Sequence, residues 1–336
     1  MSSAPSTAAV VVHSRTPRSP PDARMRWSAP MRTLPPEVVF CRADARALGW
    51  SDSALTRAVR SGRLLRLRRD CFTSTSVADP VLAAVAAARS CHGSFVSDLS
   101  ALLLHGLPLV GPPPPVPALT VLRTGTGDVA RARLFRAGLR EHDISVVGGV
   151  PVTSVARTVV DVARHHPIRT AVAAMDHALH HELTTGDELA DVVAFCRRWP
   201  GGDRAARAVA LADGRAESPL ESVSRLTIAW LGLPAPDLQR RIRNDRGVII
   251  ARTDFYWDDL GVVGEADGRA KFERDEKVDQ TWERHDDLDA LGLQIARWGW
   301  LHATAAPLQL DARIRAAFER GRRRNALALP RRWSVA

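Results

Sequence analysis

Two short turn sequences divide residues 238–268 into three strand-like runs. The turn Asn244-Asp245-Arg246-Gly247 separates LQRRIR from VIIARTDFYW, and the turn Asp258-Asp259-Leu260-Gly261 leads into VVGEADG. Asn, Asp and Gly are typical of turns because they tolerate the backbone angles that a tight reversal requires. The pattern predicts three successive antiparallel strands.

A helix is expected directly before these strands, in the run SPLESVSRLTIAW. Ser218 is a typical N-cap residue, and Pro219 suits the first helical position. Glu221 stands three residues after Ser218, which predicts a capping box. This spacing is a sufficient structural explanation for Glu221.

Three carboxylates stand at the end of the strand region. Glu265 and Asp267 are two residues apart, so both would point to one face of their strand, and Asp254 lies on the neighbouring strand. Crowded carboxylates repel one another unless a cation binds, and their oxygens suit Mg²⁺ or Mn²⁺. The spacing predicts a metal site of these three residues, where Lys271 would position water or neutralise charge. The alternative is ordinary acidic residues at strand ends and turns.

Residues 42–72 have the pattern of a helix, a turn, a second helix and a hairpin. Ser51 is expected to cap the second helix, with Leu55 facing inward and Gly62 ending the helix. In the hairpin, leucines at positions 65 and 67 alternate with arginines, which predicts a half-buried strand with a basic outer face. The apolar side of the first helix would consist of Ala43, Ala47 and Leu48.

The exposed side of this unit is strongly basic, since residues 42–69 contain eight Arg and two Asp. A helix-turn-helix places its second helix in the major groove, and arginines of a following wing bind phosphates. The pattern predicts a DNA-binding winged helix-turn-helix, the alternative being a small helical adaptor with a solvated arginine face. The expected DNA contacts are Ser53, Thr56, Arg57, Arg60, Arg63, Arg66 and Arg68.

The charge of the whole chain is compatible with a nucleic-acid partner. The net charge is +10 and the pI about 10.8, which favours a polyanionic partner. The alternative is a high-GC genome, because 45 of the 47 basic residues are arginine. Residues 254–289 differ from the rest, with 13 acidic and 5 basic residues and a net charge of −8. Such an acidic island favours a metal-dependent site within a phosphate-binding protein, the alternative for residues 273–289 being a solvated acidic helix.

The N-terminal unit resembles a known family. The run ALGWSDSALTRAVRSGRLLRLRRDCF is similar to the N-terminal winged helix of AbiEi-type antitoxins of type IV toxin–antitoxin systems, and LHGLPL and VTSVARTVVDVAR resemble the middle of the same proteins. The family's wing usually carries a Gly where Asp70 stands here. The resemblance implies binding to double-stranded DNA, and a cognate toxin or another protein as a further partner.

The C-terminal third resembles a second family. The run TDFYWDDLGVVGEADGRAKF, with the helix before it and ERHDDLDALGLQIARWGWLHA after it, is similar to a domain of unknown function related to very-short-patch-repair endonucleases. The resemblance implies the PD-(D/E)XK, restriction-endonuclease-like fold. Asp267 occupies the position of the family's strand Lys, for which Lys271 is the expected substitute. The residues that match the family's acidic and basic positions are Glu221, Asp254, Glu265, Asp267-Gly268, Arg284 and Asp286.

These observations predict a multidomain α+β or α/β protein. Residues 1–36 are rich in Ser, Pro and Arg and would be a disordered tail. A winged helix-turn-helix at 37–78, a mixed α/β domain at 79–207 and an endonuclease-like domain at 208–325 would follow, with a short tail at 326–336. No export signal or membrane-spanning run is recognised, and no cysteines have C-x-x-C spacing, so we expect a cytoplasmic location without a membrane partner.

The expected function is DNA binding coupled to hydrolysis of DNA phosphodiester bonds by a Mg²⁺-dependent endonuclease domain. In this hypothesis Asp254, Glu265 and Asp267 hold the metal, and Lys271 and Glu221 assist catalysis. The alternative is a non-enzymatic, antitoxin-like transcriptional regulator whose nuclease fold is catalytically silent.

Overall fold

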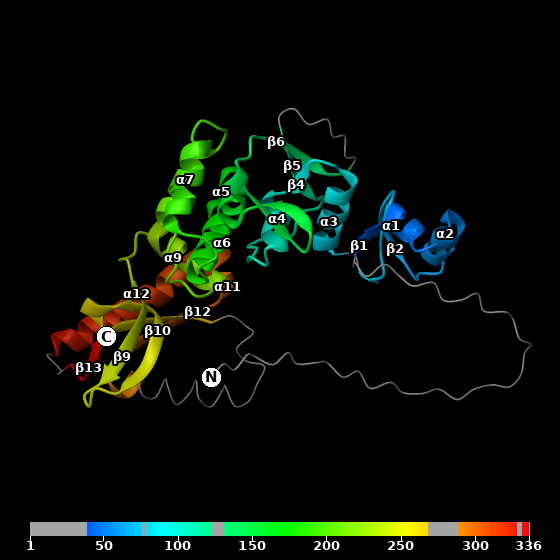
Figure 1. Cartoon of the computed structure of the whole chain (residues 1–336). Helices are drawn as coiled ribbons and strands as arrows, with labels where there is room; N and C mark the ends of the chain where they lie inside the picture. Colours follow the sequence, from blue (N-terminus) through cyan, green and yellow to red (C-terminus); the bar gives the residue numbers. More distant parts are fainter. Residues whose placement is uncertain are drawn as a thin grey trace, which may run out of the picture.

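The computed structural model describes residues 39–75, 77, 79–122, 131–267, 288–327 and 331–335. These residues form three β-sheets, each with its own helices, which follow one another along the chain (Figure 1). The mixture of helices and sheets agrees with the predicted α/β class. Within the described part of the chain, no helix is both long and apolar enough to cross a membrane.

The first unit is small and is built around one three-stranded sheet. Strand β3 lies between β1 and β2 and is antiparallel to both. The aromatic residues Phe40, Trp50 and Phe72 pack with Leu55 and Leu64 in its core. The elements of this unit are β1 (Val39–Cys41), α1 (Arg42–Ala47), α2 (Asp52–Arg60), β2 (Leu65–Arg68) and β3 (Cys71–Thr73).

The apolar side predicted for the first helix is wrong. Ala43, Ala47 and Leu48 are exposed, and Ala45 is the buried residue of α1. The reason is Trp50, whose backbone N–H donates to the Ala45 carbonyl at 3.0 Å and which is only 4% exposed. The large indole belongs to the apolar core of this unit, whereas Leu48 remains 42% exposed.

The middle unit contains a five-stranded mixed sheet in the order β6-β5-β4-β8-β7. Strands β5 and β6 are parallel, as are β4 and β8. The strands are β4 (Ser94–Val96), β5 (Ala118–Val121), β6 (Arg133–Arg136), β7 (Ile144–Val147) and β8 (Val150–Thr153).

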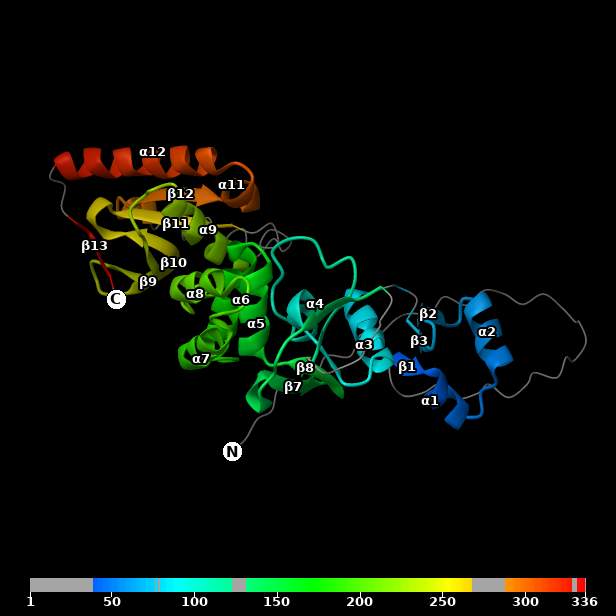
Figure 2. The ribbon, with the colours of Figure 1, turned by 90° about the horizontal axis from the view of Figure 1, so that it is seen from above.

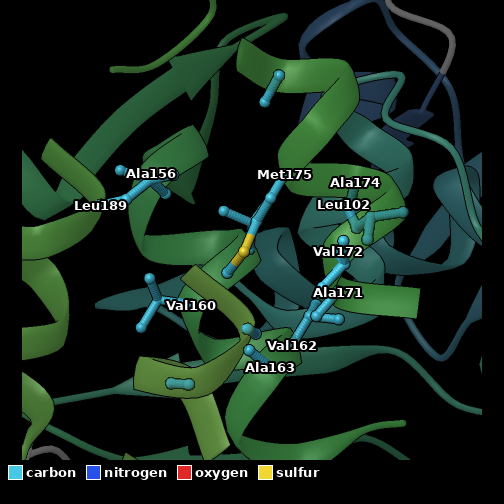
Figure 3. Packing of buried hydrophobic residues seen from close by; sticks show 14 of the residues in the cluster. Leu102, Ala156, Val160, Val162, Ala163, Ala171, Val172, Ala174, Met175 and Leu189 are labelled. Carbon is cyan, nitrogen blue, oxygen red and sulfur yellow. The ribbon is translucent and has the colours of Figure 1, made fainter. Parts of the chain in front are cut away.

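Helices form the second part of the middle unit. Met175 of α6 is fully buried and lies at the centre of an apolar cluster to which α4, α5, α7 and α8 contribute (Figure 3). The helices are α3 (Pro80–Ser90), α4 (Asp98–Leu104), α5 (Val155–His165), α6 (Ile168–His180), α7 (Gly186–Cys196) and α8 (Gly202–Leu211), with a 3-10 turn at Glu141–Asp143.

The third unit confirms the predicted helix followed by three antiparallel strands. Its sheet has the order β12-β11-β10-β9-β13, with β12 parallel to β11. The elements are α9 (Pro219–Trp230), β9 (Asp237–Asn244), β10 (Ile249–Trp257), a 3-10 turn (Asp258–Leu260), β11 (Val262–Ala266), β12 (Gln294–Trp298), α11 (Trp300–Thr304), α12 (Pro307–Ala326) and β13 (Trp333–Val335).

The two faces of this sheet bury different sets of residues. Phe255, Trp257 and Trp298 face α9 and α12, which cover one side of the sheet (Figure 2). Tyr256 and Val263 belong to the cluster on the opposite side. Alternation along the strands places Asp254 and Glu265 on this second side as well.

The last described residues extend the sheet. Strand β13 pairs antiparallel with β9, and the Trp333 indole N–H donates to the Tyr256 hydroxyl at 2.7 Å. A Cβ atom on Gly261, whose φ is +57°, would lie 2.8 Å from the Trp333 ring. Part of the segment predicted as a tail is therefore an edge strand, because a buried indole holds it against the sheet.

Candidate nucleic-acid interface

Helix α2 presents four of the side chains that the sequence predicts as DNA contacts. Ser51 caps the helix by accepting the Ala54 N–H at 3.3 Å. Leu55 and Ala58 are buried, so the other side of the helix faces outward. The exposed residues on that side are Ser53, Thr56, Arg57 and Arg60. The predicted arrangement of these four side chains on α2 is present in the structure.

The arginines that follow α2 differ in their surroundings. Arg63 is exposed and lies over the Trp50 ring, 5.3 Å from its centroid. The exposed Arg66 donates to the carbonyls of Arg68 and Arg69, at 3.3 and 2.8 Å, and so braces its own hairpin turn. Arg68 is half-buried, and its burial lowers the pKa of the guanidinium. Arg63 and Arg66 thus combine an exposed charge with a structural contact.

A chain of ion pairs fixes α1, α2 and the hairpin relative to one another. Arg42 contacts Asp70 in the hairpin turn at 3.0 Å and Asp52 at the start of α2 at 2.8 Å. Arg46 contacts the other oxygen of Asp52 at 2.8 Å. These hydrogen bonds from Arg46 and Arg42 lower the pKa of the Asp52 carboxyl. Asp70, which stands where a glycine was expected, therefore anchors the turn.

The second group of predicted site residues lies where β10 and β11 separate. Phe255 and Gly264 are the last backbone partners, which places Asp254 and Glu265 at the next position on the two strands. The N–H of Ala266 donates to Asp254 Oδ2 at 2.8 Å instead of to a strand carbonyl. Glu265 is 1% exposed and is the register partner of Arg297 on β12. The structure thus brings two carboxylates to adjacent positions.

Asp267 continues β11 by one residue. Its backbone N–H donates to the Trp298 carbonyl at 2.9 Å, and its side chain is half-buried. Among the residues that the structure describes, no group of three or more His, Cys, Asp or Glu side chains is placed to hold a metal ion. Lys271, Gly268, Arg284 and Asp286 lie outside the described residues.

Glu221 takes part in capping the start of α9 and also contacts a residue of the sheet. Its N–H donates to Ser218 Oγ at 3.2 Å, and the Ser218 hydroxyl donates to Oε1 at 2.7 Å. Its Oε2 accepts from the Glu217 N–H rather than from the N-cap backbone as a capping box requires. The side-chain amide of Gln239 also donates to Oε2, at 2.7 Å. These contacts give Glu221 a structural role.

Sequence reasoning missed Gln239. It lies between Leu238 and Arg240, the partners of Phe255 and Thr253, and so stands opposite Asp254. Its φ of +54° is unusual for a residue other than glycine. No local signal marks this residue, because its link to Glu221 depends on how α9 packs on the sheet.

One comparison with known proteins concerns the N-terminal unit. Residues 38–70 match the model of a family described as transcriptional regulator, AbiEi antitoxin. This stretch spans β1, α1, α2 and β2 and ends at Asp70 in the hairpin turn.

Two uncharacterized Mycobacterium tuberculosis proteins are also similar, Rv2248 of strain H37Rv and MT2308 of strain CDC 1551. Each is 37% identical over 130 residues, which is 39% of this chain and 46% of the relative. The chain therefore spans less than half the length of these curated relatives. The crystal structure of RV2827C from Mycobacterium tuberculosis aligns with a TM-score of 0.38 at 15% identity, over 52% of this chain and 72% of that chain.

Proposed function

We propose that the protein is a DNA-binding regulator whose residues 39–73 act as a winged helix-turn-helix. The observation that carries this proposal is the outward side of α2, with Ser53, Thr56, Arg57 and Arg60. A helix with such a face fits the major groove, where arginine recognises guanine through two hydrogen bonds. The match of residues 38–70 to antitoxin transcriptional regulators supports the same role.

The ion pairs around Asp52 support a rigid arrangement of the proposed DNA-binding unit. Arg42 and Arg46 hold Asp52 at the first turn of α2, and Arg42 also holds the hairpin turn through Asp70. A helix fixed in this way reaches the DNA with little loss of conformational freedom. Arg63, Arg66 and Arg68 would contact phosphates beside the groove.

Fluorescence anisotropy with a labelled DNA duplex of about three helical turns tests this proposal. The full chain should bind, and its affinity should fall with added salt because each neutralised phosphate releases counterions. The Arg57→Ala variant should bind more weakly, whereas Arg207→Ala, which removes an exposed arginine of α8, should not. Binding that is equal in both variants would contradict the assignment of α2.

A protein partner is a second part of the proposal. The matched family is described as an antitoxin, and an antitoxin acts on a cognate toxin. Gel filtration of the chain with the product of an adjacent gene should show a shared peak. Separate elution of the two proteins would count against this partner.

A second candidate function is metal-dependent hydrolysis of phosphodiester bonds in the third unit. It is favoured by Asp254 and Glu265, which lie on neighbouring strands where backbone pairing ends. Their oxygens suit Mg²⁺, and a metal bound there would supply an activated water and stabilise charge on a phosphate. Asp267 and Lys271 complete the proposed set, and the rival possibility is a catalytically silent fold.

Calorimetric titration with Mg²⁺ or Mn²⁺ tests the second candidate. Binding should be present in the wild type, lost in Glu265→Ala and retained in Asp259→Ala, which removes an exposed turn carboxylate. A nuclease assay on the same three proteins should follow the same order. The absence of metal binding by the wild type would favour the regulator without hydrolase activity.

A further inference from the structure

A cavity of about 1110 Å³ lies between α1, the β2–β3 hairpin and α3. It is separate from the proposed DNA-binding side of α2, because no residue of α2 lines it. The cavity is cationic, since the carboxylate of Asp70 in the lining, and those of Asp44 and Asp52 that pair with lining arginines, stand against six guanidinium groups. These belong to Arg42, Arg46, Arg68, Arg69, Arg89 and Arg131.

The neighbouring carboxylates hold two of these guanidinium groups in place. Arg42 is held by Asp52 and Asp70, and Arg89 lies 3.5 Å from Asp44. Packing of α3 against the hairpin, through the buried Cys71 and Ala86, fixes the two walls relative to each other. The ion pair of Arg42 with Asp70 also fixes the hairpin that carries Arg68 and Arg69, so this wall loses little conformational freedom when a ligand binds.

Like charges also come close together inside the cavity. The half-buried Arg68 has its pKa lowered by burial and, to a smaller extent, by the nearby Arg131. Two guanidinium groups near each other in a partly enclosed space gain most from an anion with several negative charges. A single carboxylate or chloride would neutralise only part of this excess.

The rest of the lining is mainly apolar, with Ser90 and His92 as further polar members. Its apolar members include Leu67, Ala83, Pro115, Val116 and Pro117. A ligand with a polyanionic end and a less polar body would match this lining. A nucleotide has both, and the volume slightly exceeds the roughly 300–1,000 Å³ typical of small-molecule sites.

We propose that this cavity binds a nucleoside di- or triphosphate. The phosphates would lie against Arg68, Arg69 and Arg131, and the base against Pro115 and Leu67. The proposal does not depend on DNA binding, because no residue of α2 lines the cavity; the two surfaces share the hairpin residue Arg68.

Isothermal titration of the full chain with ATP, pyrophosphate and adenosine, without divalent metal, tests the proposal. ATP and pyrophosphate should bind, and adenosine should not. Removal of one charge-assisted contact should weaken ATP binding about tenfold or more. We expect this loss in Arg69→Ala and in Arg131→Ala, which both replace exposed side chains, and no change in Arg207→Ala on α8.

Three results would overturn the proposal. The first is that the titration detects no binding of ATP to the wild type, or that Arg69→Ala and Arg131→Ala bind ATP with the same affinity as the wild type. The second is binding of pyrophosphate without ATP, which would leave a phosphate site with no place for a nucleoside. The third is loss of duplex DNA binding in these variants with no ATP binding in the wild type, which would make the cavity part of the DNA interface. Failure of DNA binding alone would leave the ATP result unaffected.

Discussion

The carboxylate of Asp254 accepts a hydrogen bond from the backbone N–H of Ala266, 2.8 Å away on the neighbouring strand. A side chain here replaces the strand carbonyl that would continue the ladder beyond Phe255 and Gly264. The two strands can therefore separate without leaving a donor unsatisfied. The separation places Asp254 and Glu265 at adjacent positions at the edge of the paired region.

The hydrogen bond of Asp254 predicts different effects for two substitutions. Asp254→Ala leaves the N–H of the buried Ala266 without its acceptor, which should lower the free energy of unfolding by about 1–3 kcal/mol. Asp254→Asn keeps an acceptor oxygen and should stay within about 0.5 kcal/mol of wild type. Urea denaturation followed by circular dichroism measures both values. If the two variants had equal free energies of unfolding, the hydrogen bond from the Ala266 N–H would not contribute to stability.

Gly264 is required by the aromatic residues around it. A Cβ atom at this position would lie 2.6 Å from the Trp298 ring and 2.9 Å from the Phe255 Cβ. Gly264→Ala should therefore destabilise the fold by about 1–3 kcal/mol through overpacking. Gly186→Ala is the matched control, because nothing lies within 4 Å of its added Cβ. A thermal unfolding curve unchanged by Gly264→Ala would contradict this packing.

The contacts of Asp98 predict that the stability of the folded protein falls at acidic pH. It is 2% exposed and contacts Nδ1 of His165 at 2.7 Å and Nε2 of His166 at 2.5 Å. Burial favours protonation of Asp98, but the hydrogen bonds from the two histidines outweigh it and hold the pKa of this carboxyl far below its usual range.

A carboxyl with a depressed pKa stabilises the folded state at pH values above its unfolded pKa, near 4, and loses that contribution as the pH falls further. The wild type should thus lose stability between about pH 5 and pH 3, and Asp98→Asn should lose less. At pH 7 the variant should be less stable by about 1.5–3 kcal/mol, because the hydrogen bonds from the two histidines lose their charged acceptor. Asn suits this position since Asp98 has a φ of +55°. Parallel pH profiles of the two proteins, from urea midpoints, would refute the role of Asp98.

The two arginines of α2 should differ from an arginine elsewhere in the salt dependence of DNA binding. Arg57→Ala and Arg60→Ala should each reduce the slope of log affinity against log salt by about 1 if the side chain contacts a phosphate. A side chain that contacts a base should instead lose about 1–3 kcal/mol at its preferred sequence only. Anisotropy titrations at several salt concentrations distinguish the two cases. If both variants had the same affinity and the same salt slope as Arg207→Ala, neither Arg57 nor Arg60 would belong to the DNA interface.

The elements that the sequence predicted well are those specified by local chemistry. The turns at 244–247 and 258–261 contain residues that favour reversal, so β9, β10 and β11 could be placed from the sequence. Ser51 and Ser218 mark the starts of α2 and α9 because a hydroxyl satisfies free N–H groups at a helix start. The outward side of α2 follows from helical periodicity alone.

What only the tertiary structure decided depends on contacts between segments far apart in the chain. Trp50 replaces Leu48 in the first core, and Trp333 converts a predicted tail into an edge strand through Tyr256. Gln239 meets Glu221 only after α9 packs on the sheet. Local patterns determine where a segment turns or forms a helix, whereas these contacts depend on which surfaces remain to be buried once the segments come together.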